Sequence, residues 1–289
     1  MFQKLKTIAF TLMGRSIAYR FGRSMYLHAR GDFSNDMSSN GEMLIQDCVL
    51  AAWKKQPIKA ANLVVFDVGA NIGDWSKALL QQAKAHEIDA HLDLFSFEPV
   101  PSTAKTLRNN LTSNDPRLHI EQVALSSSVG SAEIYVVADD AGTNSLHADP
   151  RAARQTPVVI SLTTAFSFCD SKGIGHVQLL KCDTEGHDME VIRGALPLLE
   201  QGRISVLQFE YNHRWALSRN FLRDVFLATE NLPYNVTKLQ PDHLLMFEDW
   251  HPELEKFFEG NYALIHNDAL AWFPIKNTGF NAHNVLSIK

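Results

Sequence analysis

VVFDVGANIGDWS, from Val64 to Ser76, carries the strongest structural signal in this chain. An apolar run of strand-forming residues leads to Asp67, Gly69 and Gly73 bracket a short turn, and a helical pattern begins at Asp74. A strand, a glycine turn and a helix in this order are typical of the first unit of a nucleotide-binding α/β sheet. The strand should carry Asp67 to the carboxyl edge of the sheet, where free N–H groups at the helix start suit an anionic group.

The spacing of the two glycines narrows the kind of ligand. The turn has the form GxxxG, whereas dinucleotide-binding enzymes use GxGxxG. Because Gly69 has no Cβ, a ligand can lie against the backbone there, and Gly73 lets the helix begin close to the strand. A tight turn that binds no ligand is the alternative interpretation.

Composition sets further bounds on the fold and function. The 289 residues, of which 45% are hydrophobic, suffice for one large α/β domain with an appendage. The net charge of −5 argues against a broad nucleic-acid interface. Three cysteines without a CxxC pair indicate a reducing compartment, so we expect a cytoplasmic protein with no disulfide framework or zinc ribbon.

The N-terminal segment differs from the rest of the chain. Residues 1–31 contain six basic residues and no acid, and their apolar residues have roughly helical spacing. The longest uncharged stretch, Thr7 to Gly14, is too short to span a bilayer. A helix that packs on the domain is the favoured interpretation, and a peripheral contact of residues 1–30 with an anionic membrane surface is the alternative.

The domain plan follows from these patterns. We expect an N-terminal helical segment over residues 1–60, in which a helix from about Gly41 to Lys55 either packs as an ordinary helix or closes as a lid over the cofactor. The binding domain should cover residues 61–275, with residues 276–289 as a C-terminal polar tail.

After the opening motif, strands and helices alternate. Leu92 to Phe97 is the second predicted strand and is followed by Glu98-Pro99. Glu98 lies 25 residues after Gly73. An acid at this position accepts hydrogen bonds from ribose hydroxyls in nucleotide-binding sheets. Ala124 follows the third predicted strand, where an adenine ring would lie against apolar side chains.

A second group of polar residues follows the fourth and fifth strands. CDTEGHDMEVIRGA, Cys182 to Ala195, places Asp183 and Glu185 directly after an apolar strand. The fifth strand, Ile204 to Phe209, is followed by Glu210-Tyr211-Asn212-His213. Because open α/β sheets bind ligands at the carboxyl ends of their strands, we expect these residues to gather in one crevice.

Two chemistries fit this second group. Asp183, Glu185 or His213 could act as a general base that takes a proton from a substrate hydroxyl. Alternatively, a divalent cation could bind to oxygens of Asp183, Glu210 and Asn212 and lower the pKa of that hydroxyl. The spacing favours neither.

Four motifs in order resemble the FkbM-type S-adenosylmethionine (SAM)-dependent methyltransferases. They are FDVGANIGDWS, FSFEPVPSTAKTLRNN, VALSSSVG and LLKCDTEGHDMEVIRGA, and the resemblance covers about Asn62 to Tyr211. It implies a class I methyltransferase fold, which is Rossmann-like and doubly wound, with a mostly parallel sheet and one antiparallel edge strand; the N-terminal helices would be an appendage. Typical members methylate hydroxyls of sugars or natural products.

The resemblance also implies roles for individual residues. By the resemblance, Asp67, Gly69, Asn71, Gly73 and Glu98 would bind SAM. We expect their neighbours Ala70 and Pro99, and Ala124 after the third strand, to belong to the same cofactor site. Asp183 and Glu185 match the DxEG motif, so the expected reaction is direct in-line O-methylation of a small-molecule or glycan acceptor.

Two other function classes remain as alternatives. An NAD(P)-binding oxidoreductase would use the same kind of sheet but requires GxGxxG, and a non-catalytic SAM-binding scaffold would not need Asp183 and Glu185. The sequence does not indicate the oligomeric state.

Overall fold

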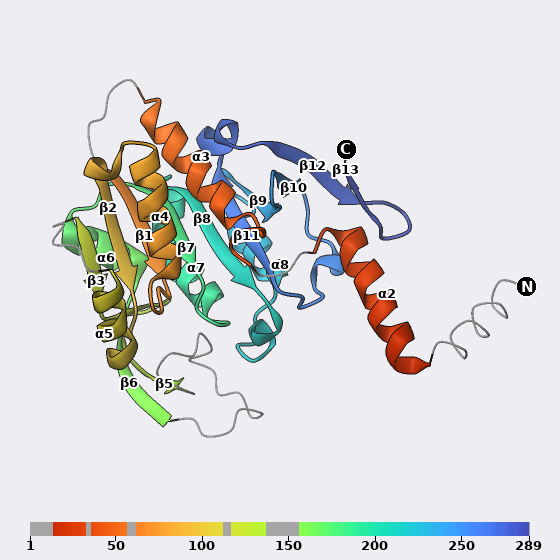
Figure 1. Cartoon of the computed structure of the whole chain (residues 1–289), viewed down its shortest axis with the longest axis horizontal. Coiled ribbons are helices and arrows are strands. Elements are labelled where there is room, and N and C mark those ends of the chain that lie inside the picture. Colours follow the sequence, from red (N-terminus) through yellow and green to blue (C-terminus); the bar gives the residue numbers. More distant parts are fainter. Residues whose placement is uncertain (1–13, 33–35, 57–61, 112–116, 137–155, 289) are drawn as a thin grey trace, which may run out of the picture.

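The computed structural model describes residues 14–32, 36–56, 62–111, 117–136 and 156–288. Residues 1–13 of the predicted N-terminal segment lie outside the described residues. The described chain forms one large sheet with helices on both faces and a second, small sheet beside it (Figure 1). The observed class is therefore α/β, as the alternation of strands and helices predicts.

The first half of the large sheet is parallel. Its strands lie in the order β3-β2-β1-β7-β8, and every neighbouring pair is parallel. Their bounds are β1 Leu63–Val68, β2 Leu92–Phe97, β3 Leu118–Glu121, β7 Val177–Cys182 and β8 Ile204–Tyr211. The chain order reverses at the β1–β7 junction, so the crevice expected of a doubly wound sheet opens there.

The second half of the sheet is mainly antiparallel, so antiparallel pairing extends beyond the antiparallel edge strand expected beside the mostly parallel sheet. β11 (Gly260–His266) lies inside the sheet, antiparallel to β8 on one side and to β9 (Tyr234–Leu239) on the other. β10 (Leu244–Phe247) continues the sheet beyond β9.

The last residues extend this half further. Residues 276–289, expected to be a polar tail, contain most of β12 (Ile275–Phe280) and all of β13 (Leu286–Ile288), which complete the sheet. Thr278 is buried while its neighbours on β12 are exposed or half-buried, so this strand, which lies between β10 and the edge strand β13, can have a largely polar sequence.

Helices cover the two faces of the sheet. α3 (Glu42–Lys54) and α4 (Asp74–Ala85) pack on one face, against side chains such as Val65 and Leu179. The other face is covered by α6 (Ala165–Lys172), α7 (Asp188–Glu200) and α8 (Leu222–Thr229). α5 (Pro101–Asn110) lies beside β3. Because α3 shares a hydrophobic core with β1 and α4, residues 42–54 pack on the sheet as one of the helices that cover it.

The remaining elements are short. The small sheet consists of β4 (Ala124–Leu125), β6 (Thr156–Thr163) and β5 (Gly130–Val136) in that order. The 3-10 helices are η1 (Asp89–His91), η2 (His213–Ala216), η3 (Pro252–Leu254) and η4 (Asn267–Trp272). Residues 137–155, between β5 and β6, lie outside the described residues.

The N-terminal helix α2 (Arg15–Arg30) projects from the body and is tied to it near its C-terminal end (Figure 1). The Tyr26 hydroxyl donates to Glu253 at 2.9 Å, and the Arg30 guanidinium lies 3.5 Å from the same carboxylate. In the part of the chain that the structure describes, no helix is both long and apolar enough to cross a bilayer.

The opening glycine turn is required by packing between two strand ends. Gly69 has φ +78°, and a Cβ there would lie 1.9 Å from the Asp183 carbonyl oxygen. Gly73 has φ +94°, and its Cβ would lie 2.7 Å from Leu107 Cδ1. The missing side chains therefore make room for the protein's own backbone and core, a different reason from the ligand contact expected at Gly69.

A Gly69→Ala substitution should lower the free energy of unfolding by at least about 2 kcal/mol, because it combines a left-handed backbone with a backbone clash. Gly130→Ala is the control, since no atom lies within 4 Å of its added Cβ. That control should change the free energy by no more than about 0.5 kcal/mol. Urea denaturation of both variants checks this, and equal stabilities would contradict the close approach of the two turns.

Candidate functional site

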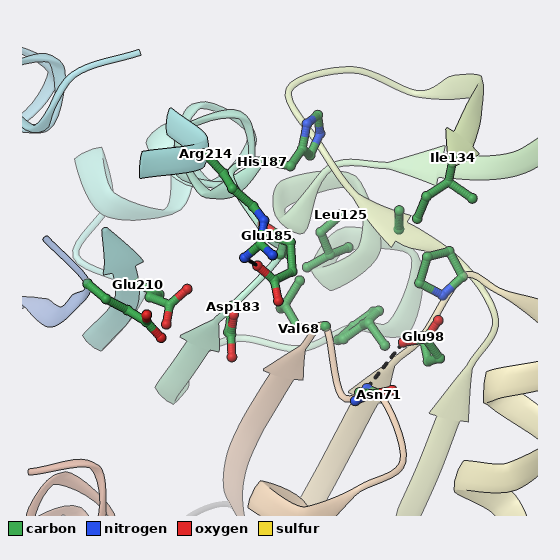
Figure 2. A pocket seen from close by; sticks show the side chains of 16 residues that line it. Val68, Asn71, Glu98, Leu125, Ile134, Asp183, Glu185, His187, Glu210 and Arg214 are labelled. Carbon is green, nitrogen blue, oxygen red and sulfur yellow. Dashed lines mark hydrogen bonds and ion pairs between the residues drawn. The ribbon is translucent and has the colours of Figure 1, made fainter. Parts of the chain in front are cut away.

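A cavity of about 310 Å³ opens at the carboxyl ends of β1, β2, β7 and β8. This volume lies at the lower end of the range of small-molecule sites, about 300–1,000 Å³. Figure 2 shows Glu98 and Asn71 on one side of the cavity, with Asp183, Glu185 and Glu210 gathered on the other. The two groups predicted at separate strand ends thus face the same space.

Glu98 is held at the end of β2 by backbone N–H groups. Asn71 N donates to one carboxylate oxygen at 3.1 Å, and Val100 N donates to the other at 2.9 Å. Each oxygen keeps a second lone pair, and the residue lines the cavity. Burial raises the pKa of Glu98 to about 7, although the two N–H donors oppose the shift.

The wall beside Glu98 is largely apolar. Ala124 and Leu125 of β4, and Ile134 of β5, line the cavity. The segment between β3 and β7, which forms the small sheet, therefore supplies part of the cavity wall. The Ala124 position agrees with the expectation of an apolar surface there.

The structure divides the residues expected to bind the cofactor. Gly69, Asn71, Glu98, Pro99 and Ala124 line the cavity. Ala70 instead packs with Leu107 and Leu111, and Gly73 precedes α4 as its N-cap, so neither lies in the lining.

Asp67 also lies away from the cavity lining. It is fully buried, accepts a hydrogen bond from Ser76 Oγ at 2.7 Å, and has its other oxygen 3.2 Å from Lys181 Nζ. Its carboxylate points to the face covered by α3 and α4, because alternate strand residues face opposite sides of a sheet. The structure thus places Asp67 as a support beneath the turn.

The pair of Asp67 and Lys181 belongs to a polar row that crosses the sheet. Ser96, Asp67, Lys181 and Gln208 lie in register on β2, β1, β7 and β8. Each is buried, and the Gln208 amide donates to Glu42 of α3 at 3.1 Å. The row links the first turn of α3 to the middle of the site.

Lys181 connects this row to the cavity. Its ammonium lies 3.6 Å from the Asp183 carboxylate as well as close to Asp67. Burial alone would lower the pKa of Lys181, but the nearby carboxylates of Asp67, Asp183 and Glu42 raise it above its ordinary value. Lys181 therefore stays charged and opposes part of the negative charge of the site.

Carboxylates dominate the side of the cavity opposite Glu98. Glu185 forms an ion pair with Arg214, and Glu210 lies at the end of β8. Burial, with the charge of Asp183 as the next cause, raises the pKa of Glu185 to about 8 and that of Glu210 well above its ordinary range. Burial and mutual repulsion therefore make the ionised forms of Glu185 and Glu210 less favourable here than they would be in water.

The predicted cation site is not supported by the geometry. Asn212 Nδ2 donates to Glu210 at 2.5 Å, and Asn212 Oδ1 accepts from Arg214 N at 2.8 Å to cap η2. The amide oxygen is therefore engaged by the backbone. Among the described residues, no group of three or more His, Cys, Asp or Glu side chains is arranged to hold a metal ion.

His213 is exposed and does not line the cavity, which corrects its expected place in the site. η2 begins at His213, one residue after β8 ends, so the chain turns there and the next residue, Arg214, faces the cavity instead. Figure 2 shows the Arg214 side chain reaching Glu185.

Glu259 and His187 also line the cavity, and neither was among the predicted site residues. Glu259 comes from the loop before β11, and its sequence surroundings gave no signal. His187 Nε2 lies 3.0 Å from Ser126 Oγ in the wall near β4. The DxEG motif marked the His187 region, whereas nothing marked Glu259.

Lys181→Met should lower the free energy of unfolding by about 3–5 kcal/mol, because it leaves Asp67 buried without its cation. The matched control is Lys172→Met, which removes an ion pair to Glu121 from a lysine side chain that is 44% exposed. That control should cost no more than about 1 kcal/mol. Denaturant titration measures the free energy of unfolding of both variants. Equal losses would show that the buried pair stabilises the protein no more than the exposed pair does.

Comparison with known proteins identifies a family. The family described as "Methyltransferase FkbM domain" matches residues 67–248, more than half of the chain. The chain is 25% identical over 179 residues to the hexuronic acid methyltransferase AglP of Haloferax volcanii. This alignment covers 62% of this chain and 67% of that protein.

Solved structures with a similar chain path include two methyltransferases. The SAM-dependent methyltransferase from Agrobacterium tumefaciens aligns with a TM-score of 0.41 and 7% identity, over 78% of this chain and 62% of that one. The precorrin-6y C5,15-methyltransferase from Geobacter metallireducens aligns with a TM-score of 0.35 and 13% identity, over 76% and 86% of the two chains.

Proposed function

The chain belongs to the FkbM methyltransferase family and has a class I methyltransferase fold, and we propose that it transfers the methyl group of SAM to a hydroxyl oxygen of a sugar, glycan or natural product. One observation carries the proposal: a single cavity has the buried carboxylate of Glu98 at one side and the acids Asp183 and Glu185 at the other. A residue that binds the nucleoside and a residue that accepts a proton can therefore act on SAM and its acceptor in the same cavity.

The residues of the cavity fit SAM. Glu98 has a lone pair available on each oxygen, which suits the two ribose hydroxyls, and Ala124, Leu125 and Ile134 offer an apolar surface for adenine. The carboxylates on the opposite side suit the positive sulfonium. When bound, SAM would supply an electrophilic methyl carbon, and the protein's task is then to position the acceptor oxygen.

Asp183 is the best-placed group to take the acceptor's proton. Its carboxylate is 40% exposed, while Lys181 approaches it from the sheet side at 3.6 Å. Glu185, in contrast, is engaged by Arg214, and Glu210 is buried. Asp183 would hold the proton that the acceptor hydroxyl loses when its oxygen takes the methyl group, while the carbon–sulfur bond of SAM breaks and S-adenosylhomocysteine leaves.

Glu185, Arg214 and Glu259 would orient the acceptor. Carboxylates and a guanidinium together can accept from and donate to several hydroxyls, as a sugar ring requires. The similarity to a hexuronic acid methyltransferase supports an acceptor of this kind. The acidic wall and the net charge of −5 are unfavourable to a nucleic-acid acceptor.

Asp183→Asn should keep SAM affinity within about threefold and lower methyl transfer at least about 100-fold, because the amide cannot take the proton. The assay is tritiated methyl transfer from SAM to a pool of lysate glycans and small metabolites, with calorimetry for SAM binding. His213→Ala serves as the control and should retain nearly full turnover, since His213 lies outside the cavity lining. Full activity of Asp183→Asn would remove Asp183 from the chemistry.

SAM affinity should rise as the pH is raised from 6 to 8 and then level off. With a pKa of about 7, Glu98 loses its proton over this range, and only the ionised carboxylate can accept from both ribose hydroxyls without itself donating. Glu98→Gln should weaken SAM binding at pH 8 by about tenfold or more, since hydrogen bonds to a charged group contribute about 1.5–3 kcal/mol.

Calorimetric titrations at several pH values test this assignment to Glu98. Glu185, whose pKa is about 8, and Asp188, whose pKa is about 6, titrate in the same range, so the variant is the necessary comparison. The rise should be absent in Glu98→Gln. If the variant keeps the same pH profile, another group is responsible for it.

A further inference from the structure

Helix α2 has two faces with different surroundings. Arg23, Tyr26 and Arg30 face the body of the protein, where the Arg23 guanidinium lies 4.7 Å from the ring centre of Phe258. The Tyr26 ring packs edge-on against the same Phe258, with ring centres 6.0 Å apart. Docking of α2 thus uses its polar and aromatic face.

A row of apolar side chains lies elsewhere on the helix. Ile17, Phe21 and Met25 follow one another at intervals of four residues, so they share one side of α2. Their exposed fractions are 53%, 56% and 58%. We call these three residues the apolar ridge; in the described part of the chain they remain largely accessible to water, which is an unfavourable state for such large side chains.

Charge indicates what can cover the ridge. Residues 1–31 contain six basic residues and no acid, although the whole chain has a net charge of −5. Arg15 and Arg20, on the same helix as the ridge, are exposed. An apolar row with exposed arginines and no nearby acid on its own segment is the arrangement that binds in the interface of an anionic bilayer.

We propose that α2 docks on an anionic lipid surface through the apolar ridge, with Arg15 and Arg20 contacting lipid phosphates. Insertion of the ridge into the headgroup region would remove its side chains from water, and the arginines would add an attraction that salt screens. The helix would lie in the plane of the surface, held to the body by Arg23, Tyr26 and Arg30.

The docked helix would bring the site to the same surface. Phe258, which α2 contacts, is adjacent in the chain to Glu259, which lines the cavity. A lipid-anchored acceptor could therefore present its hydroxyl at the cavity while its anchor stays in the bilayer. This statement about the acceptor rests on the proposed methyltransferase function, whereas the binding of α2 to lipid does not.

Sedimentation with vesicles tests the proposal on the full chain. The probes are vesicles of phosphatidylcholine alone and vesicles that also contain phosphatidylglycerol. The wild-type protein should sediment with the anionic vesicles, bind the neutral ones at least about tenfold more weakly, and be released as salt is raised. The combined variant Ile17→Ser, Phe21→Ser and Met25→Ser should lose at least about tenfold in partitioning, because only the apolar contact is removed.

A matched control removes apolar area elsewhere. Val129→Ser, Val159→Ser and Leu227→Ser change side chains that are 67%, 69% and 54% exposed, and this combined variant should bind vesicles like the wild type. Circular dichroism and SAM calorimetry on each variant check folding and separate lipid binding from the methyltransferase proposal. Phe21→Glu alone is a second ridge variant and should also lose binding.

Three outcomes would overturn the proposal. The wild-type protein could fail to bind anionic vesicles, or the ridge variant could bind them as well as the wild type does. Sedimentation velocity could also show a dimer that only the ridge variant dissociates, without vesicle binding, in which case the ridge is an interface between two copies of the chain.

Discussion

The buried ion pair between Lys181 and Asp67 is the constraint on which the site depends. It joins β1 to β7 at the point where the strand order reverses, directly below the turns that begin at Gly69 and Asp183. Two buried charges are tolerated there because each has further partners: Ser76 donates to Asp67, and Asp183 lies near Lys181. The pair therefore fixes the relative positions of the two turns that form the floor of the cavity.

Much of this arrangement was predictable from local sequence. The acid after the second strand, Glu98, and the acids of the DxEG motif, Asp183 and Glu185, lie in the cavity because strand ends in a parallel sheet share one edge. That rule needs only the order of strands, which hydrophobic runs and glycine turns reveal. The bounds of β2, Leu92–Phe97, were also predicted correctly, because this strand is a hydrophobic run that ends before Glu98-Pro99.

Other features depend on contacts that the sequence does not display. Asp67 meets Lys181 because the two residues lie in register on β1 and β7, and register between distant strands is set by tertiary packing. The sequence predicted His213 in the site and did not predict Arg214. Because η2 begins at His213, the chain turns there and Arg214 faces the cavity instead. Glu259 reaches the cavity from a loop near the end of the chain, where no motif marks it.

A crystal structure of the protein with S-adenosylhomocysteine would show directly whether this cavity binds the nucleoside through Glu98. We expect both ribose hydroxyls to lie within hydrogen-bond distance of the Glu98 carboxylate, with the sulfur atom facing Asp183. A nucleoside bound outside this cavity, or one whose ribose does not contact Glu98, would contradict it.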